Sequence, residues 1–246
     1  MSPAQPTADA GARRHFYLRR LHSLSGVVPV GLFLVEHLWT NARAVYGRDA
    51  FNRGVGDIQA LPFLAWIELL GIGLPLAFHA LYGFVIAAQA RPNVGRYGWS
   101  RNWMYLLQRV TGVVAFVFIV VHLWEFRVQK LLGRMAWQDF YGRLVTDLDV
   151  AHPALFVLYF LGITAAVFHF ANGLWLVGNT WGITLGERSM RRSAVLCGLL
   201  GVLLWGLGMN TLLHFAYRCG GVIPMPEQDV GASCRDADAA PRHPGN

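Results

Sequence analysis

Charged residues are scarce in this sequence. Asp, Glu, Lys and Arg together make up 14% of the 246 residues, whereas hydrophobic residues make up 54%. Water-soluble domains carry roughly 25% charged residues, so this composition places the chain among membrane proteins. The chain also lacks a Gly-rich dinucleotide fingerprint and a cluster of cysteines suited to an iron–sulfur centre. It therefore does not itself encode dinucleotide-binding or iron–sulfur chemistry of these types.

Cysteines are few as well. The sequence has three, and Cys197, which lies within an apolar run, is expected to be a small packing residue. Cys219 and Cys234 follow the last apolar run and could pair in an oxidising compartment, although the sequence leaves their pairing open. No CxxCH motif is present, which excludes covalent attachment of a c-type haem.

Long apolar runs fill most of the chain. A hydrocarbon core about 30 Å thick is crossed by about 20 mostly apolar residues in helical form. Five runs reach this length, so we predict an all-α membrane protein with five transmembrane helices. Their expected positions are roughly 21–42, 62–90, 103–126, 153–181 and 193–217. Residues 1–20 have no short apolar region leading to a cleavage site, so we expect a cytoplasmic extension and not a signal peptide. Residues 218–246 are expected to form a tail on the outer side.

The basic residues indicate the orientation in the membrane. With the N-terminus inside, the inner segments and the outer segments each carry ten Lys and Arg residues. The inner ten are packed into short segments, whereas the outer ten are spread over longer segments and mixed with nine acidic residues. We therefore expect the N-terminus inside and the C-terminus outside. We then expect the net charge of +7 to serve binding to anionic lipids or to a docked partner on the inner side of the membrane. It does not indicate nucleic-acid binding.

Four histidines lie well within the first four predicted spans, one in each: His37, His79, His122 and His169. An ionisable residue at such depth indicates a functional site. Adjacent spans run in opposite directions, so the first and third histidines share an outer level, and the second and fourth share an inner level. A single buried histidine is more often a hydrogen-bonded core residue than a ligand, but that explanation does not account for four at matching depths.

The local sequence sorts these histidines into the same two pairs. The motif "HLW" occurs in spans one and three, and "FHxxxG" occurs in spans two and four. The spans also begin alike, with "LSGVV" at 24–28 and "VTGVV" at 110–114. Spans one and two therefore look like a distant copy of spans three and four.

Two neutral imidazoles that face each other at one level are the axial ligands of a six-coordinate b-type haem. We therefore predict a four-helix bundle that holds two haems, one at each level, with the fifth helix beside it. Gly83 and Gly173 each follow a histidine by four residues and lie on the same helix face, where a missing side chain would let the porphyrin approach. Gly26, close to three turns before His37, would face the inner haem. Close helix packing in lipid is the alternative explanation for each glycine. Zinc is less expected, because it prefers three or four clustered ligands.

Four stretches, "RLHSLSGVVPVGLFLVEHLWTN", "PLAFHALYGFVI", "QRVTGVVAFVFIVVHLW" and "FHFANGLW", together resemble a known family. It is the single-polypeptide, five-helix, di-haem cytochrome b anchor of succinate:quinone oxidoreductases, which include succinate dehydrogenases and fumarate reductases. The likeness covers about residues 15–192. It implies that the first and third central histidines ligate the outer haem and that the second and fourth ligate the inner one.

The resemblance also implies partners and a location. A flavoprotein subunit and an iron–sulfur subunit would dock on the inner face of a bacterial cytoplasmic (inner) membrane and supply the succinate chemistry that this chain lacks. Electrons would enter at the inner haem, pass to the outer haem and reduce a quinone near the outer face. Members with two haems on one polypeptide typically use menaquinone.

Three carboxylates within the spans are candidates for the quinone or proton-transfer step: Glu36, Glu68 and Glu125. All three lie in the outer half of the expected topology. Glu68 ranks first because it lies deeper than the start of its span, whereas Glu36 and Glu125 could face water at the interface.

Three residues at the inner level are candidates for binding the haem propionates: His22, Ser23 and Arg109. The "HSLSG" stretch resembles the family's propionate-binding segment. The alternative for Arg109 is an interfacial arginine whose guanidinium reaches toward water.

Two other functions are compatible with the sequence. One is a di-haem anchor of another quinone-linked complex, such as the cytochrome b of a quinol oxidising complex or the anchor of a hydrogenase or formate dehydrogenase. Cytochrome b of the first kind places two ligands on each of two helices, whereas no span here has two central histidines. The other is a haem-free transporter or proton channel that uses the histidines as proton relays.

Overall fold

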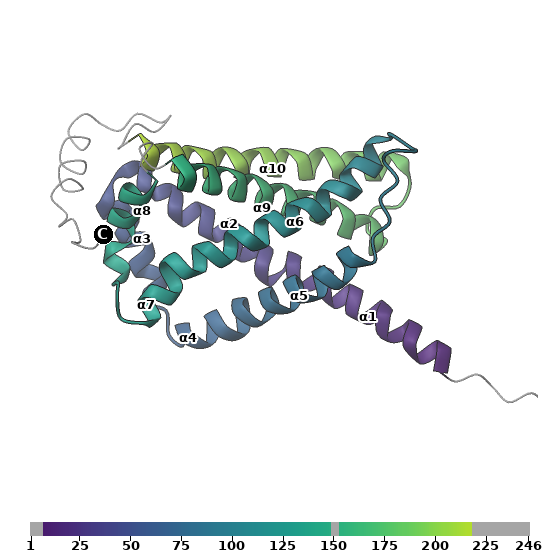
Figure 1. The fold of residues 1–246 in the computed structure, drawn as a ribbon, viewed down its shortest axis with the longest axis horizontal. Coiled ribbons are helices and arrows are strands. Elements are labelled where there is room, and N and C mark those ends of the chain that lie inside the picture. Colours follow the sequence, from purple (N-terminus) through teal and green to yellow (C-terminus); the bar gives the residue numbers. More distant parts are fainter. Residues whose placement is uncertain (1–6, 149–152, 218–246) are drawn as a thin grey trace, which may run out of the picture.

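The computed structural model describes residues 7–148 and 153–217, and the regular structure in these two stretches is helical. Five helical segments are long and apolar enough to cross a membrane, which confirms the all-α architecture and the five predicted spans. They are Ala10–Tyr46, Leu64–Ala88, Ser100–Leu131, Pro153–Thr180 and Glu187–Ala216. Figure 1 shows that they run roughly along the long axis of the molecule.

The first span is interrupted at Pro29. Helix α1 (Thr7–Val27) and helix α2 (Pro29–Ala42) follow each other directly, and Pro29 has no N–H and therefore cannot continue the hydrogen-bond ladder of α1. The amide of Val28 still donates to Leu24 O at 2.9 Å, and that of Leu32 donates to Val28 O at 3.2 Å. Figure 1 shows α1 extending beyond the other helices. Residues 7–20, expected to be an extension, thus continue the helix of the first span.

The second and third spans each contain a π-helical segment. In the second span, α4 (Leu64–Trp66) leads into η2 (Ile67–Gly73) and then α5 (Leu74–Ala88). The ring of Pro75 would clash with the carbonyl of Gly71 in a regular α-helix, and the wider π turns lie just before this proline. The third span consists of α6, η3 and α7. Their bounds are Ser100–Leu123, Trp124–Val128 and Gln129–Leu131. Such π segments are frequent at functional sites, and here each carries a carboxylate.

The fourth and fifth spans are single helices, α9 (Pro153–Thr180) and α10 (Glu187–Ala216), that lie side by side (Figure 1). Glycines allow close approach between spans: a Cβ added at Gly162 would lie 2.1 Å from the ring of Phe118 on α6. Because lipid provides no hydrophobic driving force between helices, such small residues are what permits tight packing there.

Three short helices cover one end of the bundle, and we call it the α3/α8 end. They are α3 (Arg48–Gln59), η4 (Trp137–Asp139) and α8 (Phe140–Asp147). The core at this end consists of Phe51, Tyr141 and Phe215, each at most 2% exposed. The opposite end, which we call the short-loop end, holds residues 89–99 and 181–186, which join neighbouring spans.

Burial raises the pKa of the Tyr141 phenol, with the nearby Arg48 guanidinium opposing the rise. The outer surface of the spans is apolar. Large side chains such as Leu199, Val202 and Leu203 on α10 are more than half exposed, as expected for helices that face lipid.

Candidate functional site

The structure brings the four central histidines together as two pairs. The rings of His37 on α2 and His122 on α6 have centroids 5.7 Å apart and planes at 78°. Those of His79 on α5 and His169 on α9 have centroids 6.0 Å apart and planes at 86°. Two imidazoles that share one metal ion, with metal–nitrogen bonds of about 2.0–2.1 Å, have ring centroids roughly 6 Å apart. The separations are therefore compatible with a shared metal ion in each pair.

The two pairs lie at different levels of the bundle. The ring of His79 lies against Gly26, where an added Cβ would be 2.3 Å from His79 Cε1, and the ring of His169 lies against Gly112, where it would be 2.9 Å from His169 Cε1. Gly26 precedes His37 by eleven residues, and Gly112 precedes His122 by ten. At 1.5 Å per residue these intervals are about 15–17 Å along the helices.

Gly83 and Gly173 lie against side chains next to the histidine pair, and their contact with a haem stays a prediction. A Cβ at Gly83 would be 3.2 Å from His22 Nε2, and a Cβ at Gly173 would be 3.2 Å from Gln108 Nε2. These glycines therefore face residues next to the histidine pair, whereas Gly26 and Gly112 face its rings. The prediction for Gly26 named the correct level, while Gly112 was missed. The repeat of "LSGVV" as "VTGVV" was the signal that could have found it.

Three of the central histidines have their Nδ1 atoms next to an oxygen. His79 Nδ1 is 2.9 Å from the carbonyl oxygen of His22, and His169 Nδ1 is 2.9 Å from that of Gln108. His122 Nδ1 is 3.1 Å from the Tyr159 hydroxyl. A carbonyl oxygen accepts only, so the proton of His79 and of His169 lies on Nδ1 and the lone pair lies on Nε2. A metal-ligating histidine typically donates its other ring N–H in this way.

His37 differs from the other three. The Asn41 amide nitrogen is 3.5 Å from His37 Nδ1 and 3.4 Å from Nε2, while its shorter bond, of 2.7 Å, goes to the His37 carbonyl oxygen. Taken together, the four histidines form two pairs of facing imidazoles. This set of nitrogen donors fits two haems with two histidine ligands each, and the structure itself contains no haem.

Of the predicted propionate residues, His22 contacts the His79/His169 pair. The ring of His22 stacks on that of His79, with centroids 4.1 Å apart. Ser23 Oγ donates to Arg20 O at 2.9 Å and accepts from Trp181 Nε1 at 3.0 Å. His22 thus lies against one ring of the pair, whereas the Ser23 hydroxyl bonds to Arg20 and Trp181.

Arg109 has unused hydrogen-bonding capacity. Its Nη1 donates to Tyr105 O at 2.6 Å and its guanidinium covers the Tyr105 ring, but its buried Nε has no hydrogen-bond partner among the described residues. The buried hydroxyl of Tyr82, whose ring centroid is 6.1 Å from that of His22, has none either. Unpaired buried polar groups are costly. Tyr82 lies next to His22, and Arg109 directly follows Gln108, which contacts His169, so both residues are candidates for binding a polar group of a ligand. Tyr82 was not predicted, because a single tyrosine within an apolar run belongs to no local motif.

The three candidate carboxylates have different partners. Glu68 on η2 forms an ion pair with Arg127 on η3. Glu125, also on η3, accepts a hydrogen bond from the Tyr159 hydroxyl at 2.7 Å. Glu36 is exposed and accepts from Thr40 Oγ1 at 2.5 Å. Glu68 and Glu125 thus interact with neighbouring spans, whereas Glu36 interacts within its own helix.

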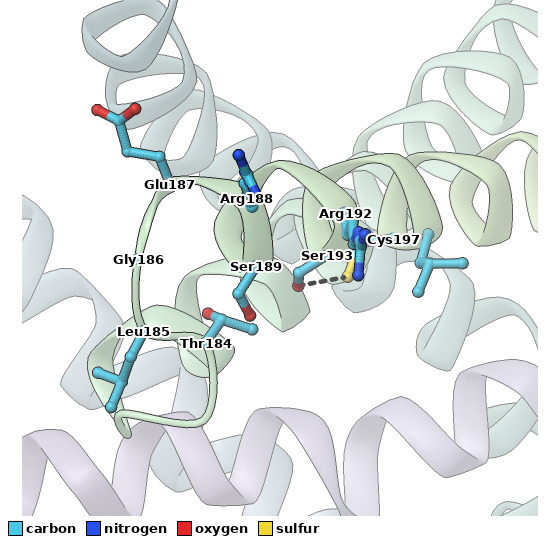
Figure 2. A pocket seen from close by; sticks show the side chains of 10 residues that line it. Thr184, Leu185, Gly186, Glu187, Arg188, Ser189, Arg192, Ser193 and Cys197 are labelled. Atoms are coloured by element: carbon cyan, nitrogen blue, oxygen red, sulfur yellow. Dashed lines mark hydrogen bonds between the residues drawn. The ribbon is translucent and has the colours of Figure 1, made fainter.

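Two further features of the described residues concern other kinds of site. Among the described residues, no group of three or more His, Cys, Asp or Glu side chains is placed to hold a metal ion. A cavity of about 720 Å³ lies between residues 184–186 and the start of α10 (Figure 2). It is lined by Arg188, Arg192 and Cys197 among others, but by none of the central histidines. Cys219 and Cys234 lie outside the described residues.

Five apolar spans with paired central histidines define a membrane-embedded cytochrome b type of chain. The family model described as "Succinate dehydrogenase/Fumarate reductase transmembrane subunit" matches residues 86–208. The chain is 41% identical over 202 residues to the succinate dehydrogenase cytochrome b558 subunit of Bacillus subtilis (strain 168), covering 82% of this chain and 98% of that relative. The chain therefore belongs to the succinate dehydrogenase/fumarate reductase transmembrane subunit family, as the resemblance predicted.

Proposed function

We propose that this chain is the membrane anchor and electron-transfer subunit of a succinate:quinone oxidoreductase, with two b-type haems between an iron–sulfur subunit and a quinone. The observation that carries the proposal is the pairing of four histidines from four spans in a chain of this family. When bound, the haems supply one-electron carriers within the hydrocarbon region. The relative's name, cytochrome b558, supports the b type of haem.

The four central histidines would hold these groups, and in His79 and His169 the lone pair available for this lies on Nε2. Backbone carbonyls fix the ring orientation of His79 and His169, so these two ligands are oriented by helices and not by mobile side chains. Arg109 and Tyr82, each with an unpaired polar atom, would bind the haem propionates together with His22 and Ser23.

The short-loop end faces the cytoplasm and carries the docking surface for the flavoprotein and iron–sulfur subunits. Six exposed arginines support this placement, because short basic segments mark the inner side of the membrane. They are Arg91, Arg96, Arg101, Arg188, Arg191 and Arg192. The His79/His169 pair, which neighbours α1 at Gly26, is then the first to receive electrons, and the chain is a multi-pass protein of the bacterial cytoplasmic membrane.

Quinone reduction takes place toward the α3/α8 end, and menaquinone is the acceptor. Glu68 is the residue that we assign to quinone protonation, because it is a carboxylate within a span and its partner, Arg127, belongs to the next span. Glu125 and Glu36 lie toward the same end. Moving one charge across the membrane is worth about 2.3 kcal/mol per 100 mV, so a membrane potential can contribute to transfer between the two levels.

A reduced-minus-oxidised optical spectrum of the purified complex tests the proposal. We expect a b-type signal, two steps in a redox titration, and co-purification of a flavoprotein and an iron–sulfur protein. His79→Ala and His37→Ala should each remove one step, whereas His15→Ala, which alters an exposed histidine of α1, should remove neither. Absence of any bis-histidine b-type signal would favour the haem-free transporter instead. Two haems without a flavoprotein partner would favour the anchor of another complex.

A further inference from the structure

His122 is connected to a carboxylate through a tyrosine. Its Nδ1 lies 3.1 Å from the Tyr159 hydroxyl, and that hydroxyl donates to Glu125 Oε2 at 2.7 Å. The three residues come from α6, α9 and η3, and Tyr159 is only 6% exposed. Water therefore has little access to the tyrosine that joins the other two residues.

The direction of each hydrogen bond follows from proton counting. A phenol has one proton, and Tyr159 donates it to Glu125, so the Tyr159 oxygen can only accept from His122. The His122 proton therefore lies on Nδ1, and Nε2 keeps its lone pair. The N–H of His122 points at an oxygen that is polarised by a carboxylate, which makes the imidazole a stronger electron donor than one bonded to a neutral acceptor alone.

Comparison of the two halves of the internal repeat shows that only His122 has a tyrosine and a carboxylate at these positions. Glu125 follows His122 by three residues, and Thr40 follows His37 by three. Tyr159 precedes its span's central histidine by ten residues, and the corresponding position in the second span is Leu69. The first copy thus has neither the tyrosine nor the carboxylate. The His79 and His169 Nδ1 atoms, in turn, face backbone carbonyls.

We propose that Tyr159 and Glu125 are positioning residues that fix the tautomer of His122 and raise its donor strength, and thereby lower the midpoint potential of the haem held by His37 and His122. This inference rests on the proposed function. A stronger imidazole donor stabilises ferric over ferrous iron, so the effect falls on one of the two haems. The effect would give different midpoint potentials to two haems that each have two histidine ligands.

Redox titration of the complete membrane-bound complex with the substitution Tyr159→Phe tests this inference. Loss of such an outer partner typically costs 10–100-fold in metal affinity or activity, and we expect the preference for ferric over ferrous iron to change by the lower end of this range. A tenfold change in the preference for ferric over ferrous iron corresponds to 59 mV for a one-electron couple. We expect the midpoint potential of one haem to rise by about this amount or more while the other stays unchanged. Glu125→Gln, which keeps the tyrosine and removes the negative charge, should shift the same haem in the same direction by less.

Tyr141→Phe is the matched control. The Tyr141 hydroxyl also lies 3.1 Å from a histidine nitrogen, His214 Nε2, in the buried core of the α3/α8 end. The variant removes an equivalent buried tyrosine–histidine bond without touching a central histidine, so both potentials should stay at their wild-type values.

The outcomes are distinguishable. Absence of b-type haem from the wild-type complex overturns the proposed function itself. Two haems whose potentials are unchanged in Tyr159→Phe, or move together, overturn the inference alone. If Tyr159→Phe does not assemble, Glu125→Gln decides, and an unchanged potential in that variant also overturns the inference.

Discussion

Glu68 and Arg127 form an ion pair that joins the second span to the third. Each lies in a π-helical segment, Ile67–Gly73 for Glu68 and Trp124–Val128 for Arg127. Both side chains are about one-quarter to one-third exposed, at 26% and 34%. A lone charge within a span costs about 2.5–3.5 kcal/mol on insertion scales, so pairing is what makes both residues tolerable there.

The first prediction concerns Glu68→Gln. The variant keeps the shape of the side chain and removes its charge and its ability to carry a proton, so we expect the rate of quinone reduction to fall about 10²-fold, in the range lost with a proton-transfer group. Reduction of the haems by succinate, followed optically, should persist. Glu36→Gln, at an exposed position, is the control and should have little effect. Unchanged turnover and pH dependence in Glu68→Gln would rule out the assigned role.

The second prediction concerns Gly26→Ala. The added methyl carbon would lie 2.3 Å from His79 Cε1, so α1 and the ring cannot both keep their positions. We expect the haem content per chain, measured after extraction, to fall to about half, with loss of the step assigned to the His79/His169 pair. Gly206→Ala on α10, where an added Cβ meets nothing within 4 Å, should retain both haems. Full haem content in Gly26→Ala would contradict the packing of His79 against α1.

The third prediction concerns Gln108→Leu. Gln108 Oε1 accepts from Asn172 Nδ2 at 2.6 Å, and Gln108 Nε2 donates to His169 O at 3.0 Å. The variant leaves the buried Asn172 amide with only a 3.3 Å contact to Met104 O, which should cost about 1–3 kcal/mol. At about 2–4 °C per kcal/mol for a chain of this size, thermal unfolding of the solubilised complex should show a clear decrease in Tm. The control is Gln89→Leu, which removes an exposed bond to Arg19. An equal effect of both variants would contradict a specific role for Gln108.

The fourth prediction concerns alkaline pH. Burial raises the pKa of Tyr141 above its ordinary value of 10. Below pH 10 the phenol is protonated in both the folded and the unfolded chain and contributes no pH dependence. Above pH 10 the unfolded chain loses this proton while the folded chain keeps it, so the free energy of unfolding falls as pH rises through the raised pKa.

Thermal unfolding scans above and below pH 10 check this prediction, with phenolate absorbance as the second measurement. Tyr141→Phe should remove part of the alkaline loss of stability, whereas Tyr217→Phe, at an exposed position, should not. Equal alkaline sensitivity of wild type and Tyr141→Phe would show that Tyr141 is not responsible.

Much of the fold and of the histidine arrangement could be predicted from the sequence. Uninterrupted apolar runs give the spans, and the alternating direction of neighbouring spans is enough to put His37 beside His122 and His79 beside His169. That pairing in space agrees with the prediction, while the ligand roles are still a proposal. The local motifs predict the same pairs independently, because "HLW" occurs in spans one and three and "FHxxxG" occurs in spans two and four.

The rest depends on contacts that no local pattern reveals. The sequence analysis predicts no helix in the segments that hold α3 and α8, and the burial of these helices depends on Phe215 near the end of the last span. The two π-helical segments contact each other through the ion pair of Glu68 and Arg127, a contact between spans that the local sequence does not reveal. Tyr159 in the sequence is one aromatic residue among many, and its importance becomes visible only when α9 is placed against α6.

The second span is the least enclosed of the five, and this has a consequence for substitutions. None of its residues from Leu64 to Ala88 is buried within the chain, so most side chains there have room for a change in volume. The fourth span, in contrast, buries Tyr159 and Gly162. Conservative apolar substitutions should therefore be tolerated more widely in the second span, away from His79 and Glu68, than in the fourth.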